Sequence, residues 1–189
     1  MGKIVFLVEE ASMEAALNGI LPRLFPKWQE SLHWQVVPHD GKDNLEQPIP
    51  RLLRGWREPG IRFVILRDQD RADCLKIKHN LQKLCQRGKR EDTLIRIPCR
   101  MLEAWFIGDL SAVAQAFDDH TIAGLKEKNK YRNPDSLGDP VYELRKLKPG
   151  YGKVSGAEAI SPHLKLDGTN TSHSFRVFVE GLRSYVKNN

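Results

Sequence analysis

Acidic residues follow two of the apolar runs in this sequence, in a pattern that favours the binding of a hard cation. Glu9 comes directly after the run 3–8, and Asp68 and Asp70 follow the run 61–66. In extended backbone, residues i and i+2 project to the same side, so Asp68 and Asp70 are expected to present two carboxylates to one ion. Mg²⁺, with Mn²⁺ as a substitute, prefers a few carboxylates together with water and phosphate oxygens. The sequence therefore predicts a Mg²⁺ site that contains Glu9, Asp68 and Asp70.

Glu103 is a fourth candidate ligand, and the acids also have plainer explanations. An Asp-x-Asp turn arises wherever an acid caps the next helix, and Glu103 alone would interact favourably with a helix N-terminus. Several uncompensated acids at one sheet edge repel one another unless a cation or basic side chains intervene. Arg67 and Arg71 flank the Asp-x-Asp segment, so ion pairing stays open as the alternative to a metal.

Alternating strands and helices must bring these acids together. Strands are expected at the apolar runs, and helices at the segments of helical spacing between them. The strands cover 3–8, 33–37, 61–66 and 93–97, and the helices cover 12–25, 45–56, 73–86 and 101–107. This alternation predicts the α/β class, with a small parallel sheet that has helices on both faces. Ligands of such sheets bind at the carboxyl ends of the strands, where the acids are expected.

The alternation of strands and helices ends after the fourth strand and its helical turn. Short helical pieces are expected over 113–117, 141–147, 157–164 and 175–185, separated by loops rich in Lys, Asn, Gly and Pro. We therefore expect an α/β core over residues 1–110 and a helical extension over 111–189 that packs on the core.

The charge of the chain favours polyanionic partners. The formal net charge is +6, and such a balance attracts DNA or RNA through counterion release. The extension carries several basic residues that are able to hold a phosphate backbone, although a solvated surface would explain them equally. They are Lys126, Lys128, Lys130, Arg132, Arg145, Lys146 and Lys148.

Membrane and secreted classes are not expected from this sequence. No stretch approaches the roughly 20 apolar residues of a membrane helix. The cysteines Cys74, Cys85 and Cys99 are odd in number and lack CxxC spacing, so we expect them to be unpaired packing residues. The expected location is the cytoplasm, with no membrane partner.

Five segments of the chain resemble the Toprim fold of topoisomerases, primases and overcoming-lysogenization-type nucleases. More closely, the chain is similar to a family of short bacterial Toprim-like proteins, a domain of unknown function often associated with antiphage defence. Glu103-Ala-Trp-Phe is the most specific of these segments. They are Val8-Glu9, Leu66-Arg-Asp-Gln-Asp70, Ile97-Pro with Glu103-Ala-Trp-Phe106, Tyr151-Gly-Lys153, and Ser174-Phe-x-x-Phe178.

The resemblance implies a role for each candidate site residue. Glu9 matches the Toprim glutamate that ligates metal or acts as acid or base, and Asp68 and Asp70 match its metal-binding pair. Glu103 would lie beside them, and Lys153 would stabilise charge on a scissile phosphate. The chain departs from the pattern where Glu10 replaces a glycine and where Met13 replaces an acid, with Glu14 one place later. One metal or two therefore stays open.

Three functions agree with this sequence. The first is a Mg²⁺-dependent nuclease that hydrolyses phosphodiester bonds in DNA or RNA. The second is a non-catalytic regulatory or effector subunit that acts with an ATPase partner, because the chain has no GxxxxGK[ST] loop of its own. The third is another phosphate-handling enzyme that uses Asp-x-Asp, such as a nucleotide-sugar transferase or a phosphatase. The sequence leaves the oligomeric state open.

Overall fold

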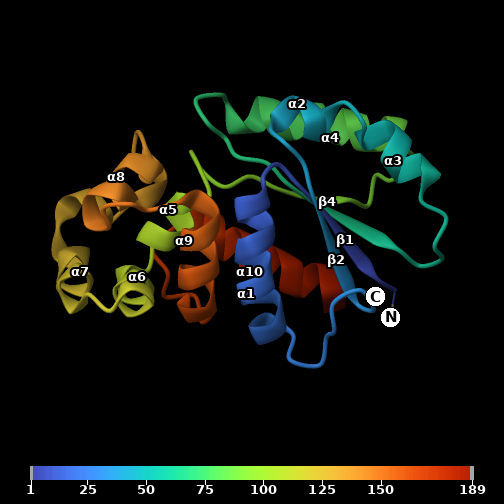
Figure 1. Ribbon diagram of the computed structural model, residues 1–189. Coiled ribbons are helices and arrows are strands. Elements are labelled where there is room, and N and C mark those ends of the chain that lie inside the picture. Colours follow the sequence, from blue (N-terminus) through green and yellow to red (C-terminus); the bar gives the residue numbers. More distant parts are fainter. Residues whose placement is uncertain (1, 188–189) are drawn as a thin grey trace.

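A parallel sheet forms the centre of the molecule (Figure 1). The computed structural model describes residues 2–187, and in that range four strands pair in the order β2-β1-β3-β4. All the pairings are parallel. The strands are β1 (Ile4–Val8), β2 (Trp34–Pro38), β3 (Arg62–Leu66) and β4 (Leu94–Arg96). The predicted α/β class is confirmed.

The strand β1 shows why the apolar runs are continuous. Each of its residues is buried. Ile4, Phe6 and Val8 point into one apolar cluster, while Val5 and Leu7 point into a second cluster on the other face. A central parallel strand that is covered on both faces needs apolar side chains at every position. The same alternation continues in β3.

Helices cover both faces of the sheet (Figure 1). On one face lie α1 (Ala11–Leu24) and α10 (His173–Lys187), and on the other lie α2 (Lys42–Glu46), α3 (Ile49–Gly55) and α4 (Cys74–Arg87). The alternation of β1, α1 and β2 and of β3, α4 and β4 follows the predicted order. The first two thirds of the chain therefore form the α/β arrangement that the sequence indicated.

The single helix predicted over 45–56 is wrong. The structure has two short helices there, α2 and α3, with Gln47 and Pro48 between them. Pro48 and Pro50 carry no backbone N–H, so neither can donate to the carbonyl four residues earlier. The chain therefore ends one helix before Pro48 and starts the next at Ile49, with Pro50 in its first turn.

The remaining helices gather at one end of the molecule, on the left of Figure 1. They are α5 (Glu103–Ile107), α6 (Leu110–Phe117), α7 (His120–Ala123), α8 (Pro140–Leu147) and α9 (Lys153–Ile160). Short 3₁₀ turns join them at Gly124–Glu127, Asn129–Tyr131, Pro134–Ser136 and Ser161–His163. The helix α7 was not predicted, because its four residues are too few to show a helical period.

The helical end shares its core with the sheet. One apolar cluster runs from β1 and α1 through α5 and α6 to α9 and α10. The ring of Trp105 stacks on Phe178 with 4.8 Å between centroids, and both side chains are buried. No helix within residues 2–187 has the length and apolar character needed to cross a membrane.

Candidate metal centre

The site lies where the sheet topology changes direction. The chain leaves β1 toward β2 on one side, whereas β3 pairs with β1 on the other side. In open parallel sheets, the helices that follow two such strands diverge and leave a crevice at their carboxyl ends. Val8 is in register with Leu66, so Glu9 and Asp68 follow the two strands at this crevice.

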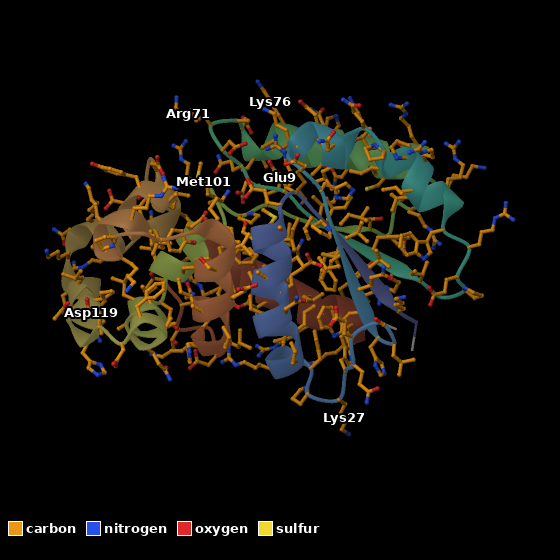
Figure 2. The ribbon with its side chains drawn as sticks, in the orientation of Figure 1. Glu9, Lys27, Arg71, Lys76, Met101 and Asp119 are labelled. Atoms are coloured by element: carbon orange, nitrogen blue, oxygen red, sulfur yellow. The ribbon has the colours of Figure 1, made fainter. Side chains whose placement is uncertain are left out.

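Glu9 is held against the end of β3. Its backbone N–H donates to the carbonyl of Leu66 at 3.2 Å, and its Oε2 accepts a hydrogen bond of 2.9 Å from the backbone N–H of Asp68. Burial is the main cause of the raised pKa of Glu9. The Asp68 N–H and the charge of Arg67 lower this pKa, and the charges of Asp70 and Glu10 raise it further. Figure 2 shows Glu9 at the end of the sheet nearest the labelled Arg71 and Met101.

Asp68 is the most deeply buried ionisable group at this edge after Glu103. Only 3% of the residue is exposed, and its Oδ1 has no hydrogen-bond partner in the described chain. Burial raises its pKa well above the ordinary value, and the charges of Glu103 and Glu9 raise it further, with Lys153 acting in the opposite direction. Such a carboxylate is stable in the charged form only beside a cation.

Glu103 opens α5 and faces the same region. It is fully buried, its Oε1 accepts a hydrogen bond of 3.3 Å from the hydroxyl of Tyr151, and its Oε2 has no partner in residues 2–187. Burial raises the pKa of Glu103, opposed mainly by the charge of Lys153. Burial and the Glu103 charge together raise the pKa of Tyr151, so its hydroxyl remains a proton donor.

Lys153 supplies a positive charge to this group of acids. It is the first residue of α9, and its ammonium pairs with the carboxylate of Glu10. Burial alone would lower the pKa of Lys153, but the hydrogen bond to Glu10 and the charges of Glu103, Glu10 and Asp68 outweigh it and raise that pKa. The hydroxyl of Ser12 also donates to Glu10, at 3.2 Å. The sequence singled out Glu10 and Lys153 separately but gave no sign that they pair.

Asp70 does not continue the extended backbone that the sequence predicted. Strand β3 ends at Leu66, and Asp70 has a left-handed φ of 53°. Its N–H donates to the carbonyl of Arg100 at 2.7 Å. The prediction of extended backbone through Asp70 is therefore wrong, since the chain turns at Asp70, where it is hydrogen-bonded to the loop that carries Arg100. Asp70 is nevertheless close enough to Glu9 for its charge to raise the pKa of Glu9, by less than burial does.

Two other charged residues near the site have structural partners. Asp109 follows Glu103 in the chain, and its carboxylate accepts from the N–H of Ala112 at 3.2 Å and from the N–H of Lys165 at 2.9 Å. It caps α6 and holds the loop after α9. Arg67 was expected to neutralise the acids, but it pairs with Glu46 at 2.9 Å. Its charge also lowers the pKa of Glu9, an effect smaller than that of burial, which raises this pKa, and than that of the Asp68 N–H, which lowers it.

The basic residues of the extension are partly engaged by acids. Lys130 contacts Glu143 at 2.5 Å, and Lys146 contacts the same carboxylate at 3.8 Å. Two members of the predicted phosphate-binding set therefore already have an anionic partner.

The donor set fits a hard divalent cation. Glu9, Asp68 and Glu103 supply carboxylate oxygens, and two of these oxygens are buried without a partner. Buried polar atoms are nearly always satisfied, so these two oxygens have the capacity to accept a cation, a water or another donor. Across residues 2–187, no three Asp, Glu, His or Cys side chains converge on one point as a metal-binding group. Glu9 and Glu103 are instead turned toward the Asp68 N–H and the Tyr151 hydroxyl.

Comparison with known proteins assigns the chain to a family. Searches of curated proteins and of solved structures give no match. The model of a domain of unknown function, DUF4276, matches residues 8–183. This range contains Glu9, Asp68, Glu103 and Lys153. The chain belongs to the DUF4276 family, a domain of unknown function.

Proposed function

We propose that this protein is a Mg²⁺-dependent nuclease that hydrolyses phosphodiester bonds in DNA or RNA. One observation carries the proposal: Asp68 and Glu103 each keep a buried carboxylate oxygen without a partner, at the switch point of a parallel sheet and beside Glu9. A divalent cation would satisfy both oxygens, and a phosphate would complete its coordination. Phosphoryl chemistry is a common use of Mg²⁺ that is held by carboxylates.

We further propose that the chain is a relative of the Toprim domain. The order and placement of the acids support this relation, with Glu9 after the first strand, Asp68 and Asp70 after the third, and Glu103 after the fourth. Glu9, Asp68 and Glu103 are the residues that would hold the ion. Asp70 is the fourth proposed ligand, although its left-handed backbone places it on the wall of a neighbouring pocket. Antiphage defence is the proposed biological setting.

Each residue has a proposed task in hydrolysis. A bound Mg²⁺ would polarise the phosphate and lower the pKa of an attacking water. Glu9, whose pKa is raised mainly by burial, would accept and return the proton of the attacking water. The ammonium of Lys153 would leave Glu10 and stabilise the negative charge that develops on the phosphate. Tyr151 keeps Glu103 in place through its hydroxyl.

Substitution of the acids tests this function. Glu9→Gln and Asp68→Asn should each abolish Mg²⁺-dependent cleavage of a labelled DNA or RNA substrate, while circular dichroism shows an unchanged fold. Asp119→Asn is the matched control, because Asp119 lies in the distant helical end (Figure 2), where its carboxylate caps α7. Cleavage that persists in both acid variants would overturn the proposed site.

A second candidate function is a regulatory or effector subunit that acts with an ATPase. It is favoured by the pairing of Lys153 with Glu10, which already neutralises one acid of the site, and by the separate orientations of Glu9 and Glu103. A subunit of this kind would copurify with an ATPase and would cleave no nucleic acid alone. Wild-type cleavage with Mg²⁺ in the absence of any other protein excludes it.

A further inference from the structure

A basic pocket adjoins the carboxylates. It has a volume of about 470 Å³ and opens to solvent beside the loop that follows β3. Four of its lining side chains are cationic and two are carboxylates. The cations are Lys42, Arg67, Arg71 and Arg100, and the carboxylates are Asp70 and Asp139. One of these carboxylates, Asp139, is already used as the cap of α8, since it accepts from the N–H of Tyr142 at 2.9 Å.

Arg67 joins the pocket to the candidate metal centre. The residue is buried, with 5% exposed, and its Nε donates to Glu46 at 2.9 Å. Its Nη1 donates to the carbonyl of Asp68. Its charge lowers the pKa of Glu9, although burial, which raises this pKa, and the Asp68 N–H, which lowers it, both have larger effects. The guanidinium is therefore held by Glu46 and by the backbone of Asp68, whose N–H also holds Glu9.

Two loops that line the pocket are hydrogen-bonded to each other. Asp70 and Arg100 both have left-handed backbones, with φ of 53° and 62°. They are linked by the bond from the Asp70 N–H to the Arg100 carbonyl at 2.7 Å, and the Arg100 N–H donates to Oε1 of Gln69 at 3.1 Å. Non-glycine residues in this conformation cost free energy and gather at sites where geometry matters for function.

We propose that this pocket binds a backbone phosphate of a nucleic-acid strand, next to the phosphodiester held at the metal centre. The inference rests on the proposed nuclease function, because it assigns the pocket to the substrate of that site. Guanidinium groups bind phosphate oxygens in a bidentate manner, and a preformed wall limits the ordering that binding requires. The substrate is then a nucleic-acid strand rather than a nucleoside monophosphate, since a monophosphate has no second phosphate to fill the pocket.

Binding in EDTA tests the pocket without any cleavage. The anisotropy of a fluorescein-labelled single-stranded oligonucleotide, in DNA and RNA versions, is measured against protein concentration at several salt concentrations. The variant Lys42→Gln/Arg71→Gln removes two exposed cations for which the structure gives no hydrogen bond or ion pair among the described residues. The control is Lys27→Gln, on the exposed surface at the opposite end of the sheet (Figure 2).

The double variant should bind at least about tenfold more weakly than wild type, and its dependence of log K on log salt should be shallower by roughly 0.7 for each lost phosphate contact. Lys27→Gln should bind like wild type. Equal binding by the double variant and by Lys27→Gln would overturn the pocket. Inorganic phosphate is the second probe: if it binds in a manner sensitive to Lys42→Gln/Arg71→Gln while the oligonucleotide does not, the pocket is a small-anion site and the proposal fails.

The outcomes separate this proposal from the nuclease proposal. Weakened binding by the double variant, with no cleavage by wild type in Mg²⁺, keeps the pocket and rejects the nuclease. Cleavage by wild type, with unchanged binding by the double variant, keeps the nuclease and rejects the pocket.

Discussion

The backbone N–H of Asp68 donates a hydrogen bond of 2.9 Å to Oε2 of Glu9, across the junction between β1 and β3. This bond fixes one carboxylate at the switch point and leaves Oδ1 of the second, Asp68 itself, buried without a partner. The two residues are 59 positions apart in the chain, yet the register of Val8 with Leu66 brings them together.

Neutralising Asp68 should stabilise the protein when no metal is present. Burial and the neighbouring acids raise the pKa of Asp68, so its ionised form disfavours the folded state. Asp68→Asn should raise the free energy of unfolding in EDTA at pH 7 by at least about 1 kcal/mol, which is roughly 2–4 °C in Tm. Asp119→Asn should give no such gain, because hydrogen bonds from Thr121 lower the pKa of Asp119 and its ionised form therefore favours the folded state. A lower Tm for Asp68→Asn would contradict the account.

The stability of the metal-free protein should fall as the pH rises. The pKa values of Glu9, Asp68 and Glu103 are all raised in the folded state, in each case first by burial. The native state therefore binds more protons than the unfolded state between the ordinary carboxyl pKa values and the raised ones, and stability is lost through that window. Urea unfolding in EDTA across this range measures the loss. Asp68→Asn should flatten the curve, and a steepened or unchanged curve would count against the site.

A divalent cation should reverse this destabilisation. A ligand that binds only the folded state at about 100 times its Kd stabilises by about 2.7 kcal/mol. Mn²⁺ or Mg²⁺ should therefore raise the wild-type Tm, and Glu9→Gln, Asp68→Asn and Glu103→Gln should lose the shift. Asp70→Asn should lose less of it, because Asp70 lines the neighbouring pocket. An equal shift in wild type and Asp68→Asn would place the ion elsewhere.

Gly156 controls the position of Tyr151. A Cβ built on Gly156 would lie 2.0 Å from Cε2 of the Tyr151 ring, so Gly156→Ala must displace the ring whose hydroxyl contacts Glu103. We expect a loss of about 1–3 kcal/mol of stability, because Oε1 of Glu103 would also lose its partner, together with weaker Mn²⁺ binding in a thermal-shift titration. Gly124→Ala, where a Cβ meets nothing within 4 Å, is the control. Equal behaviour of the two variants would show that Tyr151 does not position Glu103.

The fold could be predicted because its signals are local. β1 and β3 are buried on both faces, so their sequences are continuous apolar runs, and the helices between them carry apolar residues at helical spacing. The exception is 45–56, where apolar spacing continued across Pro48 although the backbone hydrogen bonds could not. The two prolines indicated a break in the helix, but the regular apolar spacing across them favoured a single helix.

The site could be predicted only in part. Glu9 and Asp68 lie close together as expected, because they follow neighbouring parallel strands whose carboxyl ends share one edge. The pair of Glu10 and Lys153 depends on α9 packing against α1, a contact 143 positions apart that leaves no mark in sequence spacing. The left-handed turn at Asp70 likewise depends on the loop of Arg100, which lies beside it only in the folded chain. Local pattern therefore predicts the residues, while tertiary packing decides their orientation.

Diffraction from a crystal soaked in Mn²⁺ tests the metal centre most directly. Data collected near the manganese absorption edge locate the ion without any assumption about activity. The account predicts an anomalous peak within coordination distance of carboxylate oxygens of Glu9, Asp68 and Glu103, with Oδ1 of Asp68 and Oε2 of Glu103 among its ligands. A crystal in which Mn²⁺ binds elsewhere, while these two oxygens stay without an ion, would contradict it.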